Sequence, residues 1–174
     1  MELLLDRVKT PIGTMLLVSD AESLRAADFA DYESRMHHYL RLHYGDYSLK
    51  QAKNSLGFSD RIRAYFDGEL SAIDGIRAQT GGTPFQRDVW RRLRNIRAGT
   101  TTTYSELAIQ MGKPTASRAV GMANGSNPIV LVLPCHRVIG ANGALTGYGG
   151  GLDRKRWLLN HERALPNQRE LIAK

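Results

Sequence analysis

Hydrophobic residues at the start of the chain fall in short runs separated by turn residues, which is typical of β-strands. Residues 3–8 and 14–18 flank a Thr-Pro-Ile-Gly turn, and residues 23–29 fit a further strand. Apolar and aromatic residues recur at helical spacing over 32–44, and a second short helix fits 59–66, ahead of an Asp-Gly turn. The first part of the chain therefore predicts a small unit of strands and helices without catalytic features.

A Gln-Thr-Gly-Gly linker is expected at 79–82, and a different pattern follows it. Thr83 and Pro84 provide the capping hydroxyl and the first-turn proline that open a helix. This helix is expected to end at Gly99, and its apolar stripe consists of Phe85, Val89, Leu93 and Ile96.

Two short helices separated by a glycine turn are expected next. Thr103 and Glu106 match a capping box, and the helix that they open runs to Met111. The second helix, over 115–124, is rich in small residues and carries one long cation, Arg118. This is a helix-turn-helix pattern, although helical hairpins without DNA function are common. With few long polar side chains for reading base edges, the second helix suits shape-based, sequence-tolerant contact.

The single cysteine of the chain follows a continuous apolar run. Residues 129–133 predict a buried strand that Pro134 ends, which places Cys135 at the strand end beside His136. A cysteine titrates near pH 8.5, so thiolate formation needs help from an imidazole or a helix N-terminus. The alternative is an inert buried thiol, because neighbours in an extended chain point to opposite faces. A direct pair would require a turn or an intervening water.

A glycine-rich loop with one aromatic residue covers 146–151 and suits close contact with a planar ligand. No Gly-Lys-Ser/Thr follows, so it is not a phosphate-binding loop. A last helix begins at Asp153, and Glu162 near its end could orient a histidine, or simply be exposed. Residues 163–174 are expected to form a mobile tail.

Composition narrows the class of protein. The chain has 174 residues, which allows one or two domains, and no apolar run approaches the roughly 20 residues of a membrane span. One cysteine excludes an internal disulfide and a cysteine-rich zinc site, and the isolated histidines at 37, 38 and 43 indicate packing rather than metal binding. A soluble, cytoplasmic protein is expected.

Charge is distributed unevenly along the chain. Residues 1–78 hold 10 basic and 12 acidic side chains, a net charge of −2, whereas residues 79–174 hold 14 and 5, a net charge of +9. A basic second half favours a polyanion partner for that half alone, although many basic proteins bind no nucleic acid.

The motif Pro134-Cys135-His136-Arg137-Val138 resembles the active-site signature of the O6-alkylguanine-DNA alkyltransferases. The resemblance covers essentially all of 79–174, and the first part of the chain is similar more loosely, through its Thr-Pro-Ile-Gly turn. Further segments match the family in order and spacing: Thr83–Gln86, Tyr104, Arg118–Gly121, Asn127-Pro128, Thr146–Gly150, Trp157–Leu159 and His161-Glu162.

The resemblance implies a set of catalytic roles. Cys135 is the nucleophile, His136 is its base through a water, and Glu162 holds that histidine. Asn127 braces the turn at the active site, and Tyr104 donates a proton toward the guanine as it leaves. No metal and no cofactor are implied, and the amino domain lacks the zinc cysteines that some relatives have.

The resemblance also implies how substrate is held. The main-chain carbonyls of Val138 and Cys135 accept from the base, and Tyr148 with the glycines from Gly149 onward walls the base pocket. Arg118 fills the stack after the nucleotide has flipped. The remaining DNA-binding residues are Ser105, Lys113 and Ala116. Some relatives have a hydroxyl where Gly149 stands, so the substrate range can differ.

The expected fold is α+β, with a small amino-terminal α/β support domain over 1–78. A carboxy-terminal helical domain over 79–174 has a helix-turn-helix, resembles a winged helix and contains a short sheet. The implied function is DNA repair by irreversible transfer of an alkyl group from O6-alkylguanine, and from O4-alkylthymine, to Cys135. The implied partner is double-stranded DNA with alkylated bases, bound by a monomer.

The sequence leaves two other functions to consider. A helix-turn-helix regulator with an unreactive cysteine would bind paired half-sites as a dimer, but no dimerisation helix is evident. A cysteine hydrolase would need an oxyanion hole and multiple turnover, whereas a thioether product allows a single turnover.

Overall fold

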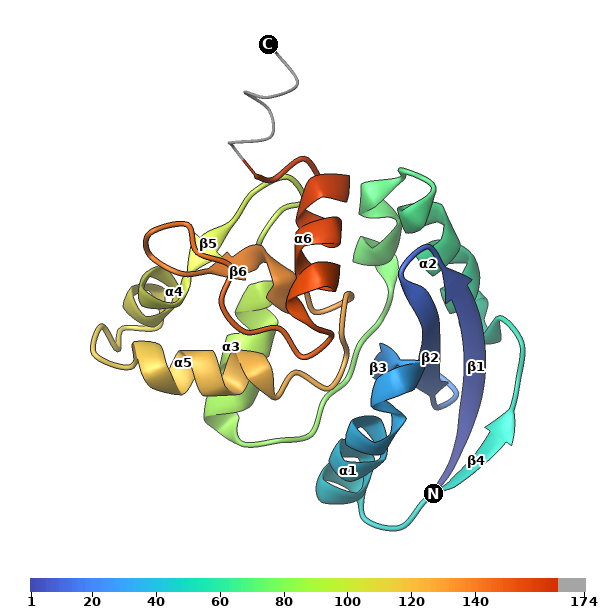
Figure 1. The fold of residues 1–174 in the computed structure, drawn as a ribbon. Helices are drawn as coiled ribbons and strands as arrows, with labels where there is room; N and C mark the ends of the chain where they lie inside the picture. Colours follow the sequence, from blue (N-terminus) through green and yellow to red (C-terminus); the bar gives the residue numbers. More distant parts are fainter. Residues whose placement is uncertain (166–174) are drawn as a thin grey trace. The chain divides into compact units, whose positions relative to one another are not determined.

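The computed structural model describes residues 1–165, and residues 166–174 of the expected tail lie outside the described residues. The chain divides into two compact units (Figure 1). The first consists of Met1–Arg87 with Pro128–Val132, and the second of Asp88–Asn127 with the chain from Leu133 onward. The α+β class is confirmed. The boundary expected after residue 78 differs from this division, which also assigns 128–132 to the first unit.

The first unit contains a four-stranded sheet in the order β3-β2-β1-β4. Its strands are β1 (Glu2–Thr10), β2 (Gly13–Ser19), β3 (Leu24–Phe29) and β4 (Ser48–Gln51). β1 pairs antiparallel with β2, β2 pairs antiparallel with β3, and β4 joins β1 in parallel. Sequence reasoning missed β4, because this edge strand has one apolar residue and is defined by its pairing with β1.

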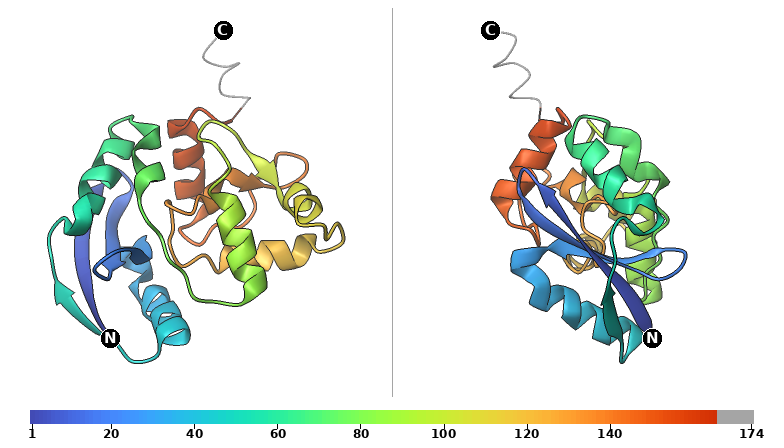
Figure 2. Two further views of the ribbon diagram at one scale, coloured as in Figure 1. Left: turned by 180° about the vertical axis from the view of Figure 1, so that it is seen from behind. Right: turned by 90° about the vertical axis from the view of Figure 1, so that its right-hand side faces the viewer.

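Helix α1 (Glu33–Tyr44) lies against one face of this sheet (Figure 2), and α2 (Phe58–Phe66) packs against β1. Both helices confirm the periodicity of the sequence. Met36 and Leu40 of α1 share a core with residues of three strands: Leu3, Leu5, Leu16, Val18 and Ala26. Three 3₁₀ turns complete the unit: η1 (Ala30–Tyr32), η2 (Ser55–Gly57) and η3 (Leu70–Gly75).

The strand expected over 129–133 is wrong. Ile129 forms only an isolated bridge with Ala27, and the chain then turns through Leu131, whose φ is +76°. All five residues are buried. Their continuous apolar run therefore reflects burial. An apolar run alone does not show whether the buried segment is an extended strand.

The second unit includes most of α3 (Pro84–Leu93), with α4 (Tyr104–Gln110), α5 (Ser117–Gly125) and α6 (Leu152–His161). α3 ends six residues before Gly99, so its expected length is wrong. Short backbone bonds such as Ile96 N–H to Leu93 O, 3.1 Å, continue the winding in place of α-helix. The 3₁₀ turn η4 (Cys135–Arg137) leads into β6 (Val138–Ile139), which pairs in parallel with β5 (Thr102–Thr103).

The helix-turn-helix pattern is present in α4 and α5. The capping box at Thr103 forms in both directions: the Glu106 N–H donates to the Thr103 hydroxyl at 3.1 Å, and the Thr103 N–H donates to the Glu106 carboxylate at 3.2 Å. The likeness to a winged helix stays a prediction.

The end of α6 corrects the expected start of the tail. The Arg163 and Ala164 N–H groups donate to the carbonyls of Asn160 and Leu159, at 3.0 and 2.8 Å, and Ala164 is buried. Within residues 1–165, no helix is long and apolar enough to cross a membrane.

Candidate functional site

The turn η4 determines how the cysteine and histidine are presented. Cys135 begins this 3₁₀ turn, and its N–H donates to the Leu133 carbonyl at 2.7 Å. The expectation that Cys135 ends a buried strand is therefore wrong. Cys135 and His136 lie in a tight turn, so their side chains are not directed to opposite faces as neighbours in an extended chain are. Cys135 is 4% exposed and His136 is fully buried.

Glu162, directly after α6, lies against this turn. One carboxylate oxygen is 2.8 Å from Nε2 of His136. Nε and Nη2 of Arg137 donate to the two oxygens of the same carboxylate, at 2.7 and 3.0 Å. All three side chains are buried. The structure thus brings together the Cys135–His136 dipeptide and the glutamate that sequence reasoning paired with it.

The second ring nitrogen of His136 has a different environment. Nδ1 is buried and has no hydrogen-bond partner within the described part of the chain. When Nε2–H donates to the carboxylate of Glu162, Nδ1 carries the lone pair. His136 can therefore accept a proton at Nδ1 while Glu162 stabilises the resulting imidazolium.

Burial and charge set the protonation states of this group. Burial alone would raise the pKa of Glu162, but the charges and hydrogen bonds of His136 and Arg137 lower it to about 2. Burial lowers the pKa of His136 despite the attraction of the carboxylate. At neutral pH the site therefore holds a carboxylate, a permanent guanidinium and a neutral imidazole ready to act as a base.

Acid should destabilise the protein through Glu162. A carboxyl with a lowered pKa contributes stability that is fully present above its ordinary value of 4.5 and is lost as the pH falls toward about 2. The full loss is about 3 kcal/mol. Urea unfolding at a series of pH values should show this slope in the wild type and in E69Q, an exposed control. It should be weaker in E162Q, and an unchanged slope in E162Q would contradict the assignment.

Arg137 and Asn124 are the residues that sequence reasoning missed. Besides its pair with Glu162, Arg137 donates from Nη1 to the Ile96 carbonyl at 2.6 Å. Asn124 is buried on α5 and donates from Nδ2 to the Cys135 carbonyl at 3.4 Å. The signal for Arg137 lay within the motif, because an arginine beside buried residues needs a carboxylate partner. Asn124 gave no signal, since it resembled a turn residue.

Asn127 holds the segment directly before the turn that carries Cys135. Its side chain is buried, and Nδ2 donates to the Leu133 carbonyl at 2.7 Å, two residues before Cys135. In addition, Nε1 of Trp90 donates to the Ala123 carbonyl at 2.7 Å, which joins α3 to α5. The turn that carries the cysteine is therefore tied to the helix-turn-helix by side-chain bonds to the main chain.

The residues expected to form a base pocket lie in neighbouring segments. Tyr104, the first residue of α4, donates from its hydroxyl to the Thr146 carbonyl at 3.2 Å. The ring of Tyr148 packs edge-on against His136, with centroids 6.5 Å apart. Val138 is buried in β6, and Gly149 is half-buried. The loop, β6 and the start of α4 are thus held next to η4.

The expected DNA-binding residues lie on α4, on α5 and in the turn between these helices. Ser105, Lys113 and Arg118 are exposed, and Ala116 is half-buried. A Cβ added to Gly121 would lie 3.7 Å from the ring of Tyr104, so α5 passes close to that tyrosine. The DNA-binding role of these four residues stays a prediction.

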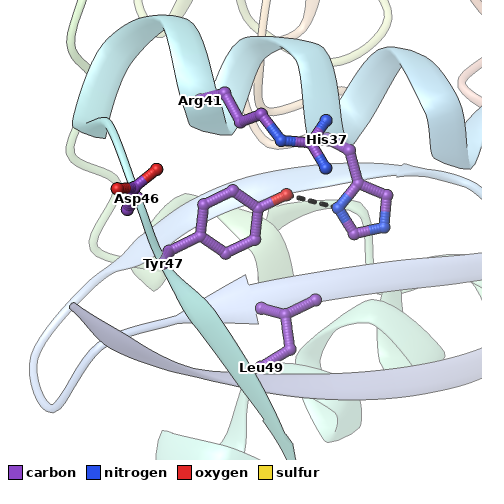
Figure 3. Close-up of a pocket in the computed structure, with 5 residues that line it drawn as sticks. All are labelled: His37, Arg41, Asp46, Tyr47 and Leu49. Atoms are coloured by element: carbon purple, nitrogen blue, oxygen red, sulfur yellow. Dashed lines mark hydrogen bonds between the residues drawn. The ribbon is translucent and has the colours of Figure 1, made fainter.

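The first unit has a separate cavity of about 290 Å³, lined by His37, Arg41, Asp46, Tyr47 and Leu49 (Figure 3). His37 hydrogen-bonds the Tyr47 hydroxyl, and His43 stacks on Tyr39. These are packing contacts, and within residues 1–165 no cluster of three His, Cys, Asp or Glu side chains could hold a metal ion.

The site therefore combines a buried cysteine, a histidine held by a carboxylate and an adjoining helix-turn-helix, an arrangement typical of a DNA-binding protein. A family model described as "6-O-methylguanine DNA methyltransferase, DNA binding domain" matches residues 84–164. The chain belongs to the methylated-DNA–protein-cysteine methyltransferase family.

Individual relatives match almost the whole chain. The methylated-DNA–protein-cysteine methyltransferase of Shigella flexneri is 50% identical over 93% of this chain and 96% of its own. The relative from Methanosarcina acetivorans is 44% identical over 88% and 94%. The crystal structure of Mycobacterium tuberculosis OGT in complex with DNA is 39% identical, covers 94% of both chains and has a TM-score of 0.78.

Proposed function

We propose that this protein repairs DNA by transferring the alkyl group of O6-alkylguanine to the sulfur of Cys135 in a single, irreversible turnover. Family membership supports this class of reaction. The observation that carries the assignment to Cys135 is the buried group that His136 and Arg137, in the same turn as the cysteine, form with Glu162. A helix-turn-helix protein with an unreactive cysteine is not favoured, because it would have no use for this group.

The chemistry needs a base, a nucleophile and a proton donor. His136 takes the thiol proton at Nδ1, through a water, and Glu162 stabilises the imidazolium. The thiolate attacks the alkyl carbon, so that an S–C bond forms and the C–O6 bond breaks. Tyr104 provides a proton to the departing guanine. The thioether product has no labile bond, and therefore each protein molecule repairs one lesion.

The target carbon is enclosed within the duplex, so the nucleotide must leave the stack at a cost of a few kcal/mol. Arg118 fills the vacated space, and the small residues of α5 let its backbone approach the minor groove. Ser105 and Lys113 contact the phosphate backbone, and Ala116 also lies on the DNA-binding surface. The carbonyls of Val138 and Cys135 accept from the base, and Tyr148 and Gly149 wall its pocket.

The partner in this proposal is double-stranded DNA with alkylated bases, bound by a monomer in the cytoplasm. O4-alkylthymine is a second substrate, because its alkylated oxygen resembles that of the guanine. The segment 1–78 supports the carboxy-terminal domain over 79–174, which carries out the alkyl transfer.

Intact-protein mass spectrometry tests the proposal. Wild type mixed with a duplex carrying one O6-methylguanine should gain one methyl group per molecule, located on Cys135, and C135S should gain none. Binding without any gain in mass would refute alkyl transfer and favour a recognition protein.

DNA affinity should fall with salt, because cationic contacts release counterions. Raising salt from 50 to 200 mM is expected to weaken binding about tenfold or more. K113M should reduce the slope of log affinity against log salt by about one, while the exposed K50M should not. Fluorescence anisotropy with a labelled duplex measures both, and a flat wild-type response would contradict electrostatic binding.

A further inference from the structure

Met122 is an exposed apolar residue to which the proposed reaction gives no role. It is 78% exposed, more than any other large apolar residue in the part of the chain that the structure describes. Single exposed apolar residues are ordinary on protein surfaces, so the meaning of this one depends on its place in the fold. That place is α5, the second helix of the helix-turn-helix.

Helix α5 has a buried inner side and an exposed outer side. The inner side consists of Val120, Ala123 and Asn124. The outer side consists of Arg118, Ala119, Met122 and Gly125. The bond from Trp90 to the Ala123 carbonyl holds the inner side, so Met122 stays directed outward. Met122 follows Arg118 after one helical turn, so the two side chains leave the same face about 6 Å apart along the helix axis.

The neighbours of Met122 on this outer side are small. Ala119 has only a methyl group, and a Cβ added to Gly125 would meet no atom within 4 Å. Small side chains let the helix backbone approach another surface closely, so a methionine among them either keeps that surface away or penetrates it. Methionine is unbranched and adapts to irregular apolar gaps. Proteins that bind the minor groove insert such apolar side chains between base steps.

We infer that Met122 is an apolar wedge that enters the minor groove beside Arg118 and opens the neighbouring base step. This inference rests on the proposed function, in which Arg118 fills the stack and α5 approaches the minor groove. The distance of about 6 Å along the helix is less than two base-pair steps of about 3.4 Å. Arg118 therefore takes the place of the flipped nucleotide, and Met122 acts on the stack next to it.

A wedge makes repair depend on the sequence around the lesion. Pyrimidine–purine steps such as TA are flexible and unstack easily, whereas an A-tract is stiff and has a narrow minor groove. The charge of Arg118 alone favours the narrow groove of the A-tract. A preference for lesions flanked by TA steps is therefore a property of the wedge, and Met122 is a specificity-determining residue.

The test compares two duplexes. Each carries one O6-methylguanine, flanked either by TA steps or by an A-tract, and intact-protein mass spectrometry follows the second-order rate of methyl transfer. Wild type is expected to react about threefold faster, or more, with the TA-flanked duplex. M122A should react about tenfold more slowly than wild type with that duplex, as for the loss of a buried apolar side chain, and should lose the preference. M122L keeps an apolar wedge and should retain both the rate and the preference.

Free O6-benzylguanine and the variant L42A are the controls. Free base requires no base step to open, so M122A should react with it at the wild-type rate, which also shows that the variant is folded. Leu42 lies on α1 in the first unit and is 66% exposed. L42A therefore removes a comparable exposed apolar side chain away from α5, and it should match wild type on both duplexes.

Three results would overturn the inference. Unchanged rates of M122A with both duplexes would show that Met122 does not act on DNA, whether or not the variant alters self-association of the protein. An equal slowing with both duplexes would exclude action through the base step. An equal loss with duplex and free base would place the effect in the pocket or the fold. Failure of wild type to react with any alkylguanine refutes the proposed function instead.

Discussion

Replacing His136 with glutamine is expected to slow alkyl transfer to Cys135 by about 10²–10⁴-fold, the usual contribution of a positioned base. Nδ1 of His136 is the group that can accept the thiol proton, and glutamine has no titratable equivalent. The fold should survive, because Arg137 still pairs with the carboxylate of Glu162.

The measurement is the second-order rate of methyl transfer from an O6-methylguanine duplex, followed by mass spectrometry. H161Q is a matched control, since His161 lies one residue before Glu162 and stacks on Trp157. It should react like wild type. A rate for H136Q within about threefold of wild type, with an intact melting transition, would remove His136 from the mechanism.

The second large effect concerns Arg118. R118A should lose about 10²–10³-fold in the rate with duplex substrate, because an extruded nucleotide leaves a gap worth a few kcal/mol to refill. Free O6-benzylguanine is not paired or stacked, so its reaction with R118A should stay near the wild-type rate.

R156A is the control for charge, since Arg156 is an exposed arginine on α6 in the same unit. It removes the same charge without touching α5 and should leave both reactions close to wild type. Equal losses on duplex and free base in R118A would show that Arg118 acts on the pocket and not on the DNA stack.

Sequence patterns located the elements better than they located the turns between them. Thr103 and Glu106 defined the start of α4 because a capping box is a local interaction. The apolar run at 129–133 predicted a strand because a buried turn and a buried strand can have the same apolar pattern. The turn becomes visible only in the structure, where the backbone of Leu131 is in the left-handed region. α3 also ends earlier than its apolar stripe predicts. Beyond Leu93 the chain forms 3₁₀-type bonds, such as that from the Ile96 N–H to the Leu93 carbonyl, so the apolar spacing continues without an α-helix.

The site was partly predictable for a similar reason. Cys135 and His136 are neighbours in sequence, but the relative orientation of their side chains depends on the turn η4. No residue pattern in the sequence predicts that turn. Glu162 lies 26 residues from His136, so the sequence left it open whether it orients a histidine or is exposed, and the resemblance favoured the pairing. Lys155 lies between arginines at 154 and 156, so nothing in the sequence marks it as buried, and its ammonium is held by carbonyls of β6 and of the glycine-rich loop.

The side chains that anchor the reactive turn bind main-chain carbonyl oxygens. Asn127 holds Leu133, and Asn124 holds Cys135 through its main chain. A group added to the sulfur therefore leaves these anchors chemically intact. Each spent molecule carries a permanent thioether, so the proportion of alkylated chains in a sample is a cumulative record of past exposure to alkylating agents.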